Sequence, residues 1–548
     1  MSQIDWIILV VTLCSIILYG VYKSKTSKNL DGYFLSNRSM PWYIVLLSIM
    51  GTQASAITFL SAPGQAYTDG MRFVQYYFGL PLAVIIICIF FVPVFKRLKV
   101  YTAYEFLERR FDSKTRTLTS ILFQISRGLS TGISIYAPSL ILSAILGWNI
   151  YWTNIIMGGM LIIYTVSGGA KAVAYTQKLQ LIIIIIGMAL AGYMVVHLMP
   201  ANVGFLEALH IGGAAGKMNI ITSGTTAKGF DWKDKYNIYS GVIGGFFLAL
   251  SYFGTDQSQV GRYLTAKNTR ESRIGLLVNG LVKIPMQFLI LLVGVMVFSF
   301  YQYKKAPIFF NDIQIEKAML TEYRDSLKLL EAEYIHLPQS RNQESDSLKD
   351  KYKAVLKRAL PGQDVNDANY IFLRFVKDFL PKGLIGLLIA VIFLAAWGSI
   401  AAALNALASC TMVDIHKKFF NKDLTSRKDY QISKLYTFGW GIFSIVVAES
   451  ASNIGNSLIE TVNILGSLFY GVILGIFMLA FWFRTIQGTS TFYAAVISEI
   501  FIIVIYKSDV ISFLWLNVIG AILVIAIAWL LQTFIFVAKS IKVIEKKS

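Results

Sequence analysis

Long runs of apolar residues recur along the whole chain, and polar residues gather between them. Every backbone amide in lipid must bond within its own segment, so we expect such runs to be helices. Runs such as Leu181–Ile186 lack the alternation of outer-membrane strands. The pattern predicts an all-α polytopic membrane protein with about 13 transmembrane helices, at 4–22, 42–66, 72–95, 118–146, 150–167, 179–198, 237–261, 274–303, 382–411, 435–449, 455–483, 489–506 and 511–537.

Charge is unevenly distributed over this pattern. The 548 residues are 55% hydrophobic and 15% charged, with a net charge of +19 and a mean hydropathy of +0.59. Soluble domains have about 25% charged residues, so the composition excludes a soluble chain. If Met1 lies outside, the predicted cytoplasmic loops hold 28 Lys and Arg and 9 Asp and Glu, which accounts for the whole +19. By the positive-inside rule, this charge indicates a cytoplasmic C-terminus and no nucleic-acid partner.

Enzyme and pump motifs do not occur in the sequence. Cys14, Cys88 and Cys410 lie in apolar runs without a CxxC pair, and the four histidines lack metal-ligand spacing. There is no P-loop and no HExxH motif. We therefore expect no enzyme and no organic cofactor, which leaves a secondary transporter, a channel or a sensor. The short C-terminal tail disfavours a sensor, and the lack of a repeated pore segment disfavours a channel.

Two apolar runs contain polar patches of similar composition, GTQAS at Gly51–Ser55 and GTDQS at Gly254–Ser258. Many secondary transporters bind solute and ion where helices break near the bilayer midplane. The helices at 42–66 and 237–261 cross the membrane in opposite directions. The patches therefore suggest two inverted repeats, with chance similarity between small polar residues as the alternative.

Four charged residues fall within the apolar runs or at their ends. A charge facing lipid costs several kcal/mol, so each is a functional candidate. Lys283 lies near mid-depth and is expected to face a cavity, whereas Arg127 can also snorkel to the surface. Asp256 lies near a helix end, and for Glu460 partial exposure is as good an explanation as function.

Four segments, in order along the chain, carry a resemblance to a known family. They are DGYFLSNRSMPW at 31–42, SGGAKAVAYTQKLQ at 167–180, GTDQSQVGRYL at 254–264 and NALASCTMVD at 405–414. The chain resembles the sodium:solute symporter family, which includes sodium/glucose, monocarboxylate, vitamin and iodide cotransporters. The resemblance implies a LeuT-type core of two inverted five-helix repeats and solute uptake driven by a sodium gradient.

The resemblance divides the chain into successive units. They are an extra N-terminal helix with the first cytoplasmic loop (1–41), a first inverted repeat (42–198), an outer loop (199–236), a second inverted repeat (237–483) containing an extracytoplasmic helical insert (304–381), and peripheral helices with a basic tail (484–548). We expect the insert to form a helical hairpin, as a solvated cap or as a lid or docking surface.

A sodium site and its limits also follow from the resemblance. Gly398 stands where the family has a hydroxyl, so one ligand is missing. Gln177, Ala401 and Ala402 replace the acid and hydroxyls of a second site, which predicts one Na⁺ per cycle. Oxygens freed by a broken helix suit a hard cation, and the expected ligands are the carbonyls of Gly51, Ala54 and Ala395 and the hydroxyl of Ser399.

The substrate site follows less directly. Tyr252 aligns with an inner-gate tyrosine of the family. A lysine among amide, hydroxyl and phenol donors suits a small sugar-like or carboxylate solute; the expected substrate residues are Gln53, Ser55, Thr58, Tyr136, Lys283 and Glu460. We therefore predict a sodium-coupled symporter of the plasma membrane that works by alternating access. The alternatives are proton coupling, with Glu460 as the titrating group, and a transporter-like sensor or channel.

Overall fold

The computed structural model describes residues 1–548 except 24–27, 339–341, 421–425, 454–457 and 546–548. The main helices are α1 (Gln3–Lys23), α2 (Leu30–Leu35), α3 (Trp42–Gln53), α4 (Ala56–Asp69), α5 (Leu80–Ile86), α6 (Val92–Leu98), α7 (Glu105–Arg110), α8 (Ser113–Leu146), α9 (Ile150–His197), α10 (Phe205–Ala214), α11 (Gly245–Gly254), α12 (Gln257–Leu264), α13 (Thr269–Phe300), α14 (Asp312–Ala318), α15 (Arg324–His336), α16 (Asn342–Ala359), α17 (Ala368–Phe379), α18 (Leu384–Cys410), α19 (Ser426–Glu449), α20 (Leu458–Trp482), α21 (Gly488–Lys507) and α22 (Phe513–Glu545).

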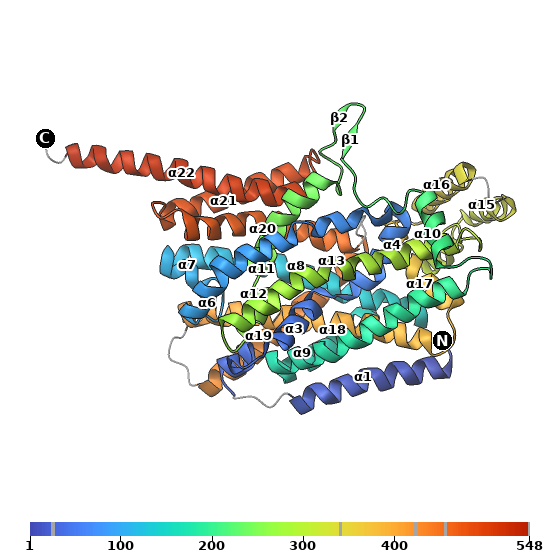
Figure 1. The fold of residues 1–548 in the computed structure, drawn as a ribbon, viewed down its shortest axis with the longest axis horizontal. Coiled ribbons are helices and arrows are strands. Elements are labelled where there is room, and N and C mark those ends of the chain that lie inside the picture. Colours follow the sequence, from blue (N-terminus) through green and yellow to red (C-terminus); the bar gives the residue numbers. More distant parts are fainter. Residues whose placement is uncertain (24–27, 339–341, 421–425, 454–457, 546–548) are drawn as a thin grey trace.

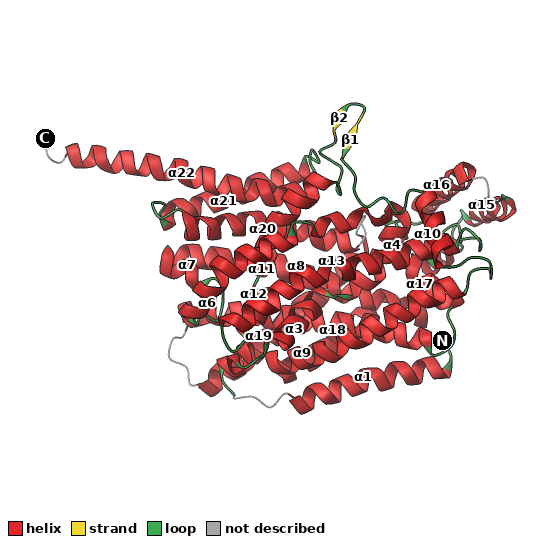
Figure 2. Cartoon of the chain, in the orientation of Figure 1, coloured by secondary structure: helices red, strands yellow, loops and turns green. Residues whose placement is uncertain are grey.

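Short elements complete the chain. Tight 3₁₀ turns are η1 (Ser36–Arg38), η2 (Gly70–Tyr77) and η6 (Ser450–Asn453), and wider π turns are η3 (Ile87–Phe91), η4 (Ser240–Gly244) and η5 (Thr411–Phe420). A small hairpin pairs β1 (Thr225–Thr226) with β2 (Gly229–Phe230). Figure 2 shows that nearly everything else with regular structure is helical.

The long helices lie side by side in one bundle (Figure 1). Within the described residues, 8 helices are long and apolar enough to cross a membrane, and shorter apolar helices accompany them. The predicted all-α polytopic fold is confirmed. Two predicted crossings, 150–167 and 179–198, lie in α9, which consists of two helices joined by a kink at Gly169, where φ is 58°. A Cβ there would lie 3.1 Å from the Tyr33 carbonyl oxygen, so glycine suits both the turn and the close approach.

Both polar patches coincide with breaks between helices. α3 ends at Gln53 and α4 begins at Ala56, because Ala54 and Ser55 leave helical geometry with ψ values of 73° and 163°. α11 ends at Gly254 and α12 begins at Gln257, with Asp256 at a ψ of 116° and its carboxylate accepting from the Ser258 amide. Each break releases backbone carbonyls and amides that a continuous helix would pair internally.

α18 runs through the centre of the bundle, and almost all of its residues from Leu388 onward are buried. It packs against α9, α8, α3 and α4. Its first turn is capped by α1, where the Asp5 carboxylate accepts hydrogen bonds from the amides of Gly383 and Gly386 at 2.6 and 3.1 Å. A negative group at a helix N-terminus is stabilising, so α1 fixes one end of the central helix.

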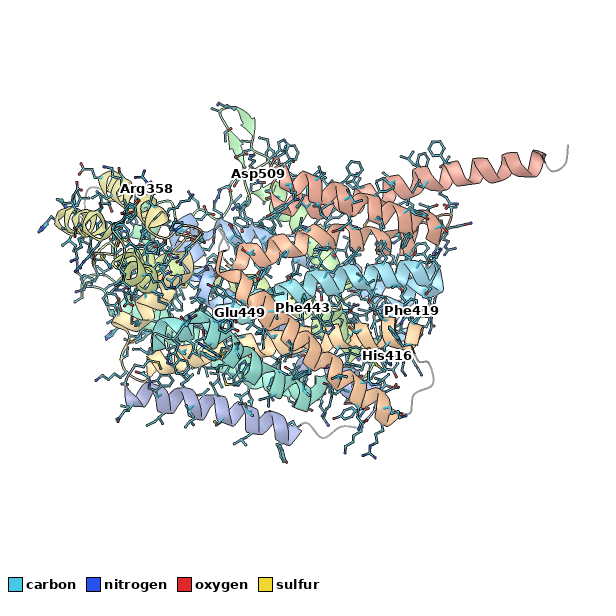
Figure 3. All side chains as sticks on the ribbon, turned by 180° about the vertical axis from the view of Figure 1, so that it is seen from behind. Arg358, His416, Phe419, Phe443, Glu449 and Asp509 are labelled. Atoms are coloured by element: carbon cyan, nitrogen blue, oxygen red, sulfur yellow. The ribbon has the colours of Figure 1, made fainter. Side chains whose placement is uncertain are left out.

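Residues 304–381 form helices α14 to α17 at one end of the bundle, called the insert face here (Figure 1). In Figure 3, Arg358 marks this end and His416 marks the opposite one. The insert has its own small core, which includes Leu327, Tyr352 and Leu356. α17 packs on α4 so closely that a Cβ on Gly64 would lie 1.9 Å from the Ala368 carbonyl oxygen. The insert is thus attached directly to one half of a broken helix.

Candidate functional site

A cavity of about 130 Å³ lies beside both helix breaks. Its wall comes from helices that are far apart in the sequence, including α4, α8, α11, α13, α18 and α20. The polar residues that line it are Thr52, Gln53, Ser55, Thr58, Tyr76, Tyr77, Arg127, Thr131, Ser134, Tyr252, Ser258, Lys283, Ser399, Asn463 and Tyr470. A concave, largely apolar site with converging polar groups is typical of small-molecule binding.

The expected sodium ligands lie where α3 meets α18. A Cβ on Gly398 would be 3.4 Å from the Gly51 carbonyl oxygen, so these two backbones face one another. The Ser399 hydroxyl lines the cavity and donates to the carbonyls of Ala395 and Ala396, at 3.1 Å each. Because α3 ends at Gln53, the carbonyls of its last turn are available to a ligand. These oxygens suit a small hard cation.

Gln177 occupies the position at which the resemblance expects an acid in some relatives, and it is fully buried. Its amide group donates to the Thr52 hydroxyl at 3.1 Å and to the Gly398 carbonyl at 2.9 Å. Its carbonyl oxygen accepts from the Ser48 hydroxyl at 2.7 Å. A neutral amide thus connects α3, α9 and α18 and uses oxygens that a second cation would otherwise contact.

Two positive charges reach the cavity in different states. Arg127 forms an ion pair with Asp256, and the Tyr470 hydroxyl lies 2.8 Å from the guanidinium and 2.7 Å from the carboxylate. Lys283 is 1% exposed, and among the described residues no carboxylate lies within ion-pair distance of its ammonium. That ammonium lies 5.4 Å from the centre of the Tyr77 ring. The cavity therefore contains one buried lysine without a carboxylate partner in the described part of the chain.

The inner-gate candidate lies beside the arginine. The Arg127 guanidinium lies 5.5 Å from the centre of the Tyr252 ring, and the Gln259 amide donates to the Tyr252 hydroxyl at 2.7 Å. A cation–π contact of this kind stabilises the position of the ring. Tyr252 thus contacts α8 through Arg127 and α12 through Gln259.

Not every expected substrate residue lies at this cavity. Gln53, Ser55, Thr58 and Lys283 line it, together with Ser399 and Tyr252. Tyr136 packs against the core outside the lining. Glu460 also lies outside it and forms an ion pair with Lys235 at 3.0 Å. The functional roles of all these residues stay predictions.

Several lining residues were not singled out from the sequence as cavity residues. Tyr77, Asn463 and Tyr470 sit in apolar or loop segments without a distinctive pattern. For Arg127 the sequence did contain an indication, because two opposite charges inside a membrane have the lowest free energy when they pair with each other. Pairing Arg127 with Asp256 in advance would have placed both inside the protein and excluded snorkelling.

Broken helices around a central cavity with converging polar groups are typical of a secondary transporter, and comparisons identify its family. The model of the sodium:solute symporter family matches residues 33–322 and 349–498. The chain belongs to the sodium:solute symporter family. It is therefore a transporter coupled to sodium and not an enzyme, and it is a multi-pass protein of the plasma membrane.

Relatives in this family transport different solutes. The chain is 26% identical to the sodium/sialic acid symporter NanT of Aliivibrio fischeri, over 96% of this chain and 93% of the relative. It is 24% identical to the sodium/glucose cotransporter of Vibrio parahaemolyticus, over 88% and 82%, and 26% identical to the sodium-coupled monocarboxylate transporter 1 of Xenopus laevis, over 88% and 68%.

A solved structure shares the fold. It is a substrate-bound, outward-open state of a Na⁺-coupled sialic acid symporter, superposed with a TM-score of 0.78 at 24% identity over 97% of this chain and 98% of that one. The likeness confirms the expected LeuT-type fold.

Proposed function

We propose that this symporter imports a small organic anion, with a carboxylate and further hydroxyl or amide groups, together with one Na⁺ per cycle. Lys283 is the observation that carries this proposal. An ammonium buried without a negative partner is costly, and a solute carboxylate is the partner that removes the cost. Arg127 does not need such a partner because Asp256 already neutralises it.

The remaining polar groups suit the rest of such a solute. Gln53 donates to Asn279 at 3.0 Å, and Tyr76 donates to Asn463 at 3.2 Å, so the amides at the wall are already oriented. Donors and acceptors that are already oriented bind the hydroxyl and amide groups of a ligand at a lower entropic cost. Sialic acid combines a carboxylate with several hydroxyls and an amide, and the similarity to sialic acid symporters makes it the first solute to test.

Sodium is a co-transported substrate in this proposal. The carbonyls of Gly51, Ala54 and Ala395 and the hydroxyl of Ser399 bind it between α3 and α18. Binding there draws the break in the first helix against the central helix and forms the cavity before the solute enters. The differential affinity of the outward and inward states for Na⁺ then supplies the coupling free energy.

One Na⁺ per cycle follows from Gln177. The amide carries no charge to offset that of a second cation, and its hydrogen bonds already use the Thr52 hydroxyl and the Gly398 carbonyl. Ala401 and Ala402 add no oxygen beyond their helix backbone.

The distribution of Lys and Arg supports an orientation with the N-terminus and the insert outside and the C-terminus in the cytoplasm.

Uptake into proteoliposomes tests the proposed function. Radiolabelled sialic acid, pyruvate and glucose are offered under an inward Na⁺ gradient at equal pH, or under an inward H⁺ gradient without Na⁺. We expect the Na⁺ gradient alone to drive uptake of a carboxylate solute, with a ratio of one ²²Na⁺ per solute. Uptake driven by the H⁺ gradient would assign proton coupling instead, and uptake of glucose alone would refute the role given to Lys283.

A further inference from the structure

A second and larger cavity, of about 530 Å³, lies between the insert and the core. We call it the chamber. Its inner wall comes from the outer ends of α4 and α13 and from the segment after α10, and its outer wall comes from α15, α16 and the start of α17. The charged residues that line it are Lys217, Lys305, Lys349, Lys353, Asp346 and Asp367. The chamber therefore has more basic than acidic groups.

Two of the lysines are balanced by carboxylates. Lys353 lies 2.9 Å from Asp367, whose carboxylate also accepts from the Phe310 amide at 2.9 Å. Lys349 lies 3.2 Å from Asp346, but the Asp346 side chain is 74% exposed, so solvent screens that pair. Both acids in the chamber wall are thus already engaged.

The other two lysines contact only neutral groups. Lys217 donates to the Thr68 carbonyl at 2.5 Å, and Lys305 donates to the carbonyls of Ile335 and Leu337 at 2.8 and 2.6 Å. Among the described residues, neither has a carboxylate within ion-pair distance. Burial lowers the pKa of Lys217, with Asp69 and Asp346 acting in the opposite direction. Two half-buried lysines of the chamber wall are therefore held by backbone carbonyls and by the rings of Phe298 and Tyr334, which lie 5.3 and 5.0 Å from Lys217 and Lys305.

Further aromatic rings line the chamber together with these lysines. Tyr67, Tyr301 and Phe310 pack edge to face around one another, with ring centres 5.6 to 6.1 Å apart. The Tyr301 hydroxyl is buried without a hydrogen-bond partner in the part of the chain described. Ammonium groups and aromatic rings that line one chamber fit a small molecule with a carboxylate at one end and an apolar or ring-shaped body at the other.

The chamber and the central cavity share a helix. Thr58 of α4 lines the cavity and Tyr67 of α4 lines the chamber. Nine residues of helix separate the two by about 14 Å along α4. A molecule held in the chamber thus lies directly beyond the outer half of the first broken helix, on the insert side.

We propose that the chamber is a second binding site for a small carboxylate anion, with Lys217 and Lys305 as its anchoring groups. We assign the transported solute itself as the anion that waits in the chamber, and this assignment rests on the proposed function. Anion binding to the chamber does not rest on it. Because neither lysine takes part in the sodium site, the chamber binds its anion without Na⁺.

Thermal unfolding of the purified full-length protein in Na⁺-free choline buffer tests the site. A ligand that binds only the folded state stabilises it by RT ln(1 + [L]/Kd), so the unfolding temperature rises with ligand concentration. We expect sialic acid or pyruvate to raise it and glucose to leave it unchanged. Lys217→Gln/Lys305→Gln should need about tenfold more anion or higher for the same shift, since a hydrogen bond to a charged group is lost at each position.

Controls separate the chamber from general charge effects. Lys328→Gln/Lys351→Gln removes two exposed insert charges that do not line the chamber and should behave as wild type. Lys305 also secures the end of α15, so Ser345→Glu is the second variant: it adds an acid to the chamber wall while both lysines remain, and it should also abolish the shift.

The proposal is overturned if the anion does not raise the unfolding temperature of the wild-type protein. It is also overturned if the anion still raises that temperature in both Lys217→Gln/Lys305→Gln and Ser345→Glu. Loss of the shift in Lys283→Gln would also overturn it, by assigning the binding to the central cavity. Na⁺-driven uptake is measured on the same preparation. An anion-dependent shift without uptake would leave the chamber standing and reject the proposed function, and uptake without a shift would do the reverse.

Discussion

Gly398→Ser restores the hydroxyl that the family resemblance expects at the sodium site. The structure admits it once two neighbouring glutamines shift. The new Cβ lies 3.4 Å from the Gly51 carbonyl oxygen, 3.3 Å from Gln177 Cγ and 2.7 Å from the Gln180 side-chain oxygen. That oxygen is at the far end of a flexible side chain whose amide nitrogen has no partner among the described residues, so the amide can rotate away. The contact with Gln177 needs a shift of a few tenths of an ångström, and this cost is the same for any side chain that begins with a Cβ.

The added oxygen strengthens cation binding. An interaction between a hydroxyl and a charged group contributes about 1.5 kcal/mol, which corresponds to about tenfold in affinity. We expect the Na⁺ concentration for half-maximal uptake to fall about tenfold in Gly398→Ser. Gly398→Ala is the matched control, because it adds the same Cβ without the oxygen. Equal Na⁺ dependence of the two variants would refute the assignment of Gly398 to the sodium site.

Three further predictions address the solute, packing and charge. Lys283→Gln should raise the solute concentration for half-maximal uptake about tenfold or more, because a charged hydrogen bond to the carboxylate is lost; an unchanged value in the uptake assay would make Lys283 structural. Gly64→Ala should destabilise the protein by about 1–3 kcal/mol by forcing α4 and α17 apart. Gly159→Ala, whose Cβ meets open space, is its control in thermal unfolding, and equal unfolding temperatures would contradict the packing argument. Arg127→Met should unfold at a lower temperature than Arg127→Met/Asp256→Asn, because only the single variant leaves a buried charge unpaired; the opposite order would mean that the pair is not buried as a unit.

The helices were predictable from sequence because lipid imposes a simple requirement. Each backbone group must be paired within its segment, so an apolar run of sufficient length has one stable outcome. The breaks at Ala54 and Asp256 were also predictable, since small and polar residues interrupt otherwise apolar runs. The two apolar runs in α9 were also predictable, whereas the position of the kink between its two helices, at Gly169, was not.

Contacts between side chains were harder to predict from the sequence. Lys283 was expected at a cavity because mid-depth lysines cannot face lipid. Arg127 and Asp256 are 129 positions apart, and only the packing of α8 against α20 and the second break brings them together. Tyr136 was assigned by likeness to relatives and Glu460 as a charge in an apolar run, and neither signal fixes which side of the helix faces the cavity.

Equilibrium ²²Na⁺ binding to the purified protein tests the central claim most directly. The claim is that one Na⁺ binds between α3 and α18 with the Ser399 hydroxyl as a ligand. We predict one Na⁺ per wild-type chain, loss of binding in Ser399→Ala with an unchanged unfolding temperature, and retained binding in Ser399→Thr. Unchanged Na⁺ binding in Ser399→Ala would contradict the account.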